Sequence, residues 1–158
     1  MGLESNTGLN VKNHYGVRDT GRAAGVYRTS GAKREMVIEI TGKMVSDGVF
    51  NVPVVLPKGA NTIAAYFEVT EAFDLGGTTP AINIGTTGSA ATNGVAISEA
   101  QAEAVGSGLG TLGGTWADDA GFAANTTVAI ALSGTEPTVD ATKGRAKVIV
   151  EYVLSSDI

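Results

Sequence analysis

The sequence contains no cysteine, and its 158 residues include a single histidine, His14. Without cysteine the chain can form neither a disulfide nor a thiolate metal site, and it has no cysteine nucleophile. A Ser-His-Asp triad or a zinc site would have to use His14, which lies among few apolar neighbours. These absences exclude most nucleophilic and acid–base constellations. We therefore expect no enzymatic activity, no metal site and no cofactor.

Long hydrophobic runs are also missing. No apolar stretch approaches the roughly 18 residues that a membrane helix needs. The segment Met1 to Asn10 has neither the positive start nor the apolar core of a signal peptide. We therefore expect no membrane association, and synthesis in the cytoplasm without classical export.

Positive charge is scarce beyond residue 34. The first 34 residues carry a net charge of +4, whereas the remaining 124 carry −9. The first segment shows little hydrophobic periodicity, so burial cannot offset the entropy lost on ordering it. We call residues 1–34 the basic arm and expect it to become ordered only against an acidic protein surface. Its basic residues are Lys12, Arg18, Arg22, Arg28, Lys33 and Arg34.

Nucleic acid is a less suitable partner for the basic arm. Its charges are dispersed along the segment rather than gathered in a run, and phosphates would be repelled by the acidic remainder. The sequence therefore favours a protein partner.

Residues 35–158 are expected to form one β-sandwich domain. A hydrophobic content of 43% and 22 glycines suit a compact fold with many short connections. Several short segments alternate apolar and polar residues with period two, and turn signals separate them, which is typical of an antiparallel sandwich. The expected strands are 35–41, 50–56, 61–70, 82–84, 126–133 and 145–154.

Local signals refine this expectation. Asp47-Gly48 predicts a hairpin turn, because both residues accept positive φ. Pro53 lies on the outward side of the expected strand 50–56 and cannot donate to a ladder, so this strand should lie at a sheet edge. In the central strand 61–70, alternation predicts one buried face, made of Ile63, Ala65, Phe67 and Val69.

One helix is expected, and glycines surround it. Ser98 and Gln101 match a capping box, which predicts a short helix ending at Gly106. The residues Gly76, Gly77 and Pro80 predict a loop before the strand 82–84. Gly108 to Gly113 has the G-x-G-x-x-G spacing of a dinucleotide site, but it follows a helix instead of a strand. We therefore interpret it as a flexible loop.

Other candidate motifs have simpler interpretations. Asp19-Thr20-Gly21 has the letters of an aspartic-protease loop, but polar and glycine-rich residues in the basic arm indicate a turn. The pairs Asp118-Asp119 and Glu71/Asp74 offer oxygen ligands for calcium without a calcium-loop pattern, and solvated loop carboxylates are the alternative. Trp116 and Phe122 offer a platform for sugar rings, whereas a lid on the core is the alternative for Trp116.

Four phrases carry a resemblance to a known family. They are Leu56-Pro57 before a long strand, the run Val69 to Asp74, the phrase Pro80 to Thr86, and the closing segment Lys143 to Tyr152. Across Val54 to Val153 the chain resembles the head-decoration, or capsid cement, proteins of tailed bacteriophages. Similar phrases occur among other phage structural and tail-associated proteins.

The resemblance implies a jelly-roll-like sandwich, often a homotrimer, that lies on the outer surface of the virion capsid and bridges major capsid protein subunits. The basic arm would then be the coat-binding segment, and the protein would be made in the cytoplasm of the phage host. Two alternatives remain at this point: a tail- or fibre-associated domain that binds host polysaccharide, and a hydrolase on the same scaffold.

Overall fold

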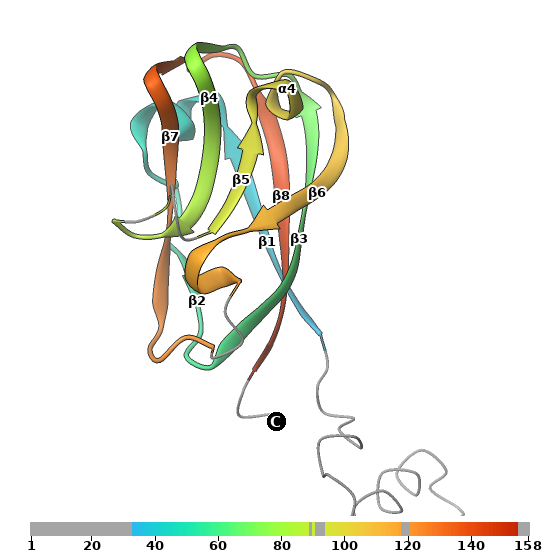
Figure 1. Cartoon of the computed structure of the whole chain (residues 1–158), viewed down its shortest axis with the longest axis vertical. Coiled ribbons are helices and arrows are strands. Elements are labelled where there is room, and N and C mark those ends of the chain that lie inside the picture. The colour runs from blue at the N-terminus through green and yellow to red at the C-terminus, as the bar shows by residue number, and fades with distance from the viewer. Residues whose placement is uncertain (1–32, 89, 91–93, 118–120, 155–158) are drawn as a thin grey trace, which may run out of the picture.

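The computed structural model describes residues 33–154, except residues 89, 91–93 and 118–120. Its elements follow one another as a series of strands with short helical turns between them (Figure 1). They are β1 (Arg34–Thr41), α3 (Gly42–Asp47), β2 (Val54–Leu56), β3 (Ala60–Glu71), β4 (Leu75–Thr86), β5 (Gly94–Ser98), α4 (Glu99–Ala102), β6 (Gly106–Leu112), η2 (Gly114–Trp116), β7 (Thr126–Val139) and β8 (Arg145–Leu154).

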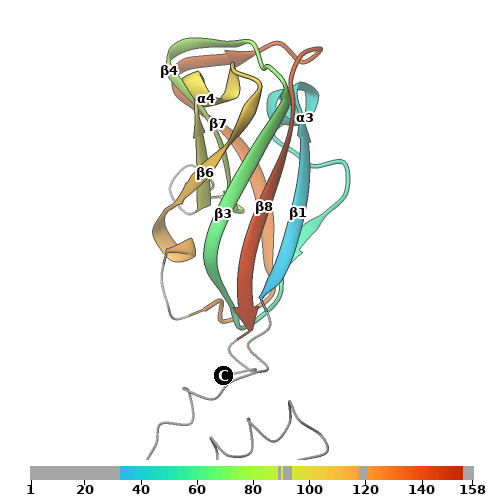
Figure 2. The ribbon, with the colours of Figure 1, turned by 90° about the vertical axis from the view of Figure 1, so that its right-hand side faces the viewer.

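All strand pairs are antiparallel, and the strand order is β1-β8-β3-β6-β5-β4-β7-β2. The sheet curls into two layers, with β1, β8, β3 and β6 side by side in one of them (Figure 2). A short seam joins the layers, where Val95 and Ala96 of β5 pair with Leu112 and Thr111 of β6. The expected all-β, jelly-roll-like antiparallel fold is confirmed.

The core lies between the two layers, and the period-two pattern explains which side chains fill it. In β1, Ile38 and Ile40 point inward, and in β8, Val148 and Val150 do the same. Each is at most 1% exposed. The second layer contributes the buried residues Ile82, Ile84, Val95, Ile97, Val128 and Ile130.

The central strand departs from the expected alternation at one point. Ala65, Phe67 and Val69 are buried as predicted, but Ile63 is 47% exposed, so its predicted position in the core is wrong. The register between β3 and β8 shifts between Thr62 and Ala64, and this bulge turns Ile63 outward. Thr62 is buried instead, and its hydroxyl donates to the carbonyl of Trp116.

The predicted hairpin turn at Asp47-Gly48 is wrong, because these residues end a second helix. Helix α3 begins after Thr41, whose hydroxyl accepts the N–H of Met44 at 3.4 Å. Gly48 supplies the left-handed cap, with φ 69°. The positive φ indicated by the sequence is therefore present, but it closes a helix. Helix α3 also means that the 98–106 segment is not the only helix.

The strand expected over 50–56 is shorter than predicted. It contains only Val54–Leu56 and begins directly after Pro53. It pairs with β7 alone and lies at one end of the strand order, so its predicted edge position is confirmed. Strand β1 lies at the other end of that order.

Two predicted loops are strands. Gly76, Gly77 and Pro80 belong to β4, whose pairing with β7 is irregular at these residues. The glycine-rich run, predicted to be a flexible loop, forms β6. Gly108 lies opposite Phe67 in the register, and a Cβ built on Gly108 would lie 2.5 Å from the Phe67 ring. Glycine is therefore needed for the close approach of β6 to β3.

Helix α4 is also shorter than expected. Its capping box is confirmed, because the Gln101 side chain accepts the N–H of Ser98 at 2.9 Å. The helix ends at Ala102, not at Gly106. It lies at the end of the molecule where β3 leads into β4 (Figure 1).

Candidate interaction surfaces

The predicted coat-binding residues are only partly described by the structure. Lys12, Arg18, Arg22 and Arg28 lie outside the described residues, as do His14, the Asp19-Thr20-Gly21 motif and Asp118-Asp119. Lys33 and Arg34 are described, and both belong to the folded body. Arg34 is the first residue of β1 and lies opposite Tyr152.

Lys33 binds within its own chain. Its Nζ lies 2.9 Å from Glu151 Oε2 on β8. This hydrogen bond, together with the negative charge of Glu151, raises the pKa of Lys33 above its ordinary value. Lys33 thus fastens the start of β1 to the end of β8. Coat binding by all six basic residues remains a prediction.

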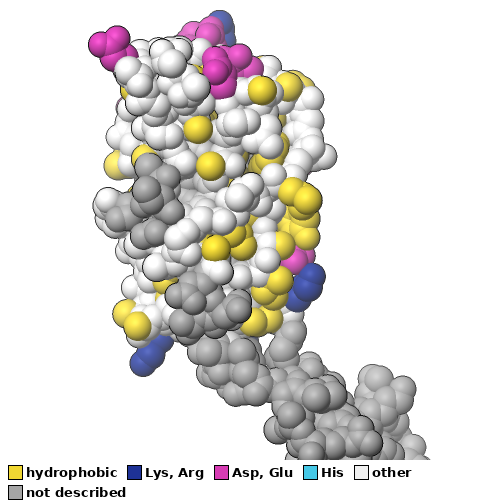
Figure 3. Space-filling model, in the orientation of Figure 1, with side chains coloured by type: hydrophobic (Ala, Val, Ile, Leu, Met, Phe, Trp, Pro, Cys, Tyr) yellow, Lys and Arg dark blue, Asp and Glu magenta, His cyan; other side chains and the backbone are white. Residues whose placement is uncertain are grey.

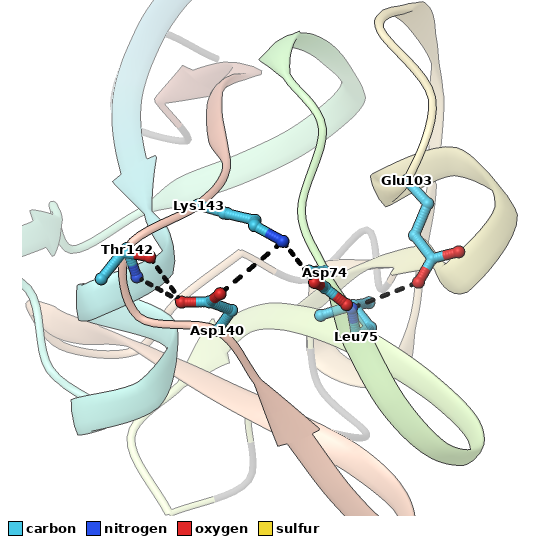
Figure 4. A network of polar contacts seen from close by, with 6 residues as sticks. All are labelled: Asp74, Leu75, Glu103, Asp140, Thr142 and Lys143. Atoms are coloured by element: carbon cyan, nitrogen blue, oxygen red, sulfur yellow. Dashed lines mark hydrogen bonds and ion pairs between the residues drawn. The ribbon is translucent and has the colours of Figure 1, made fainter.

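Acidic side chains gather at the opposite end of the molecule (Figure 3). There the turn before β8 carries Asp140, Thr142 and Lys143 (Figure 4). Lys143 Nζ lies 2.7 Å from Asp74 Oδ2 and 3.8 Å from Asp140 Oδ2. Thr142 donates its hydroxyl and its N–H to Asp140 Oδ1 at 2.7 and 2.9 Å. The turn is thereby bound to the β3–β4 connection.

These contacts change two proton affinities. The Thr142 hydroxyl and N–H, with the charge of Lys143, lower the pKa of Asp140 below its ordinary 3.8. The hydrogen bond to Asp74 and the charge of that carboxylate raise the pKa of Lys143 above 10.5. Both effects favour the charged forms that make the network.

Helix α4 is joined to the same network. Glu103 Oε1 accepts the N–H of Leu75 at 3.2 Å (Figure 4). Ala102 O accepts the N–H of Phe73 at 3.0 Å. The connection between β3 and β4 is therefore fixed from both sides, by α4 and by the β7–β8 turn. The result is a set of interlocked turns at the acidic end.

Glu71 and Asp74, considered as ligands of a calcium site, each lie beside a different basic side chain. Glu71 lies 3.4 Å from Arg145, whereas Asp74 binds Lys143. Within the described part of the chain, no cluster of three or more Asp, Glu, His or Cys residues is placed to hold a metal ion. Asp74 and Asp140 lie on exposed turns and share Lys143, which is not the cleft with two converging carboxylates that a hydrolase would need.

Trp116 has the structural role that was weighed against sugar binding. It is fully buried, its Nε1 donates to the Thr86 hydroxyl at 3.2 Å, and its ring meets Phe122 edge to face at 6.3 Å. The indole is enclosed, so it offers no face to a sugar ring. The interpretation of Trp116 as a lid on the core is confirmed.

A groove of about 410 Å³ separates the two edges of the curled sheet. Val37 and Glu39 of β1 line one side, and Phe50, Val52 and Val54 line the other. Val37 is 55% exposed and Val52 is 71% exposed. The groove is thus an apolar channel beside an unpaired edge strand, a type of surface to which extended segments bind.

A row of apolar side chains crosses the outer face of the layer β1-β8-β3-β6. The row follows the pairing register, in which Ile149 lies opposite both Val37 and Tyr66, and Tyr66 lies opposite Leu109. Leu109 is 69% exposed and Tyr66 is 37% exposed. We call Val37, Ile149, Tyr66 and Leu109 the outer row. Sequence reasoning missed it, although these residues stand at outward positions of their strands, because only the register aligns them.

Comparisons with known proteins point to phage capsids. No protein-family model matches the sequence, and no curated protein matches it. Among solved structures, the chain is similar to a chain of the capsid asymmetric unit of cyanophage Pam1, with 25% sequence identity and a TM-score of 0.53, over 86% of this chain and 94% of that chain. It also matches a chain of the acid-stable capsid of Helicobacter pylori bacteriophage KHP30, with 16% identity and a TM-score of 0.48, over 78% and 88% of the two chains. Separately, no helix among the described residues is long and apolar enough to cross a membrane.

Proposed function

We propose that this chain is a structural protein of a bacteriophage virion that decorates the outer surface of the capsid and cements neighbouring coat subunits. The observation that carries the proposal is the similarity to a chain of the cyanophage Pam1 capsid asymmetric unit. The similarity covers 94% of that chain, so it extends over a whole capsid component and not over a shared fragment. The resemblance of four phrases to decoration proteins supports the finer assignment.

The distribution of charged residues between the two ends of the body supports this role. Lys33 precedes β1, and Lys58 stands just before β3, at the end where Ala60 lies opposite Leu154. Glu71, Asp74 and Asp140 lie at the opposite end. The basic arm enters at the end of Lys33. We therefore propose that this end faces the shell and that the acidic end faces the solvent.

Mass action explains how a bound protein would stabilise, or cement, the shell. A protein that binds the assembled shell better than its separated subunits stabilises the shell by its binding free energy. The arm would contribute cations to coat carboxylates, and a homotrimer would raise avidity without any tight single site. No catalytic step is part of this function.

The test uses capsids produced from a phage that lacks the gene for this protein. Purified full-length protein is added back, sedimented with the particles and counted against the coat protein by quantitative mass spectrometry. We expect saturable binding, a copy number of the same order as that of the coat protein, and less DNA release on heating. A copy number limited to the few positions of a tail, or particles whose heat stability is unchanged at saturation, would contradict the proposal.

A further inference from the structure

We propose that the outer face of the β1-β8-β3-β6 layer is a contact between two copies of this chain, related by a two-fold axis that runs along the strands between β8 and β3. This inference concerns a two-fold contact between copies, separate from the three-fold contact of the homotrimer proposed above, and does not depend on capsid attachment. It begins from the outer row, whose four apolar side chains cross all four strands at one level.

The rows on either side of the outer row carry mostly polar side chains. Toward the acidic end, the register aligns Glu39, Lys147, Glu68 and Ser107, all of them exposed. Toward the arm end it aligns Glu35, Glu151 and Ala64. An apolar centre with a polar rim is the usual composition of a protein interface. A contiguous apolar patch of this kind is often an interaction site.

The pattern of these rows selects the partner and its orientation. The proposed two-fold axis exchanges β1 with the partner's β6 and β8 with the partner's β3. Val37 then meets Leu109 of the second copy, and Ile149 meets Tyr66. In the charged row, Lys147 meets Glu68 twice, and Glu39 meets Ser107. No like charges face each other in this arrangement.

A different axis gives a poorer match. If the two-fold axis ran along the outer row, Glu39 of one copy would face Glu35 of the other, and two like charges would be opposed. Both axes keep the strands of the two sheets aligned, which is a common way in which sheets pack face to face, so the charges decide between them. The face is thus complementary to itself, as an isologous contact requires.

The contact is small. Four strands spaced about 4.8 Å apart and a few rows of residues cover only a few hundred Å² per copy, well below the roughly 800 Å² of a standard interface. We therefore expect weak association in dilute solution that becomes significant where copies are concentrated, as on a particle.

The experiment measures the mass of full-length protein by sedimentation equilibrium between about 10 µM and 1 mM, a range suited to weak contacts. We expect the average mass to rise with concentration to twice the mass of the smallest species. Lys147→Glu and Glu68→Lys should each raise the dissociation constant of the two-fold pair at least tenfold. The reason is that each variant places two like charges opposite each other at both charged contacts of the pair. Lys58→Glu, with the same charge change outside this face, should leave the doubling intact.

The decisive measurement uses a mixture of the two single variants in equal amounts. In a mixed pair related by the proposed axis, both charged contacts are restored as Glu–Lys, so doubling should return. A mixture that stays as weak as its components would overturn the proposal, and so would a wild-type mass that does not depend on concentration. Leu109→Asp should abolish doubling without changing thermal stability. If Leu109→Asp instead leaves the mass unchanged but removes capsid binding, the face belongs to the coat and the proposal is wrong.

Discussion

Trp116 ties several distant parts of the chain to one core position. Its indole donates to Thr86 at the end of β4, its carbonyl accepts from Thr62 in β3, and its ring packs against Phe122. Because one residue unites these segments, its loss should be felt by the whole fold.

We predict that Trp116→Ala lowers the free energy of unfolding by about 3 to 5 kcal/mol, the usual range for a buried aromatic residue. Trp116→Phe should lose less, because a ring remains to face Phe122 while the hydrogen bond to Thr86 is lost. Urea denaturation followed by circular dichroism measures both values. A loss below about 1 kcal/mol for Trp116→Ala would mean that the indole is not part of the core.

Asp140 makes stability depend on pH in a definite direction. Its pKa is lower in the folded chain than the ordinary 3.8, so its stabilisation is complete above that value and is lost as the pH falls through the folded pKa. We predict that the melting temperature of Asp140→Asn lies below that of the wild type at neutral pH. The two temperatures should converge as the pH falls below about 4.

Thr142→Val provides the matched comparison. It removes the hydroxyl hydrogen bond, which is the largest cause of the lowered Asp140 pKa, and it keeps the carboxylate. It should show part of the same effect. Lys143 acts in the opposite range: its raised pKa means that its contribution is present below 10.5 and is lost as the pH rises above the folded value. Melting temperatures of Asp140→Asn and wild type that differ equally at every pH would contradict this assignment.

At the scale of single elements, β6 shows how glycine can serve a strand. Gly108 lies beneath the Phe67 ring, and Gly110 lies against Val95. We predict that Gly108→Val lowers the free energy of unfolding by roughly 1 to 3 kcal/mol, because overpacking forces Phe67 or the strand to move. Ser107→Val, one residue earlier and outward-facing, should change it by less than about 0.5 kcal/mol. Thermal melting of both variants tests the pair, and equal melting temperatures would contradict the close packing of β6.

The same elements explain what the sequence could and could not predict. Strands β1, β3 and β8 were predicted because apolar and polar side chains alternate along them with a period of two. Strand β6 was missed because glycine at its inward positions hides the period of two. Helix α3 was missed because it is only six residues long and its burial rests on Gly42 and Val45. The Ile63 bulge depends on pairing with β8, which no local pattern records.

At the scale of the whole molecule, sequence reasoning reached the fold class and the general kind of protein, since the comparisons support a structural role in a phage virion. It did not reach the contact surfaces. The outer row joins residues from four strands that are far apart along the chain, and the groove joins the two ends of the strand order. Register and layer pairing decide both, and these arise only on folding.

The basic arm can be tested with a cut that the structure refines. Because Lys33 binds Glu151 and Arg34 belongs to β1, the deletion should remove residues 1–32. We predict that the shortened protein keeps its melting temperature and binds capsids at least tenfold more weakly at low salt. The reason is that charge-assisted contacts contribute roughly 1.5 to 3 kcal/mol each where desolvated, and less at an exposed rim.

Co-sedimentation with capsids at low and moderate salt measures this effect. Restoring the arm with Arg18, Arg22 and Arg28 changed to Gln provides the matched control, since it keeps the length and removes the charge. Equal binding by the full-length and shortened proteins would remove the arm from attachment. A shortened protein that fails to fold would instead show that the arm is part of the core.

The antiparallel pairing of β1 with β8 has a mechanical consequence. Arg34 and Tyr152 are partners at one end of the ladder, and Thr41 and Arg145 are partners at the other. A pull that separates the two chain ends would open this ladder one pair at a time, like a zip, at low force. A pull on the arm against the acidic end would instead load all eight pairs together in shear, which resists far more force.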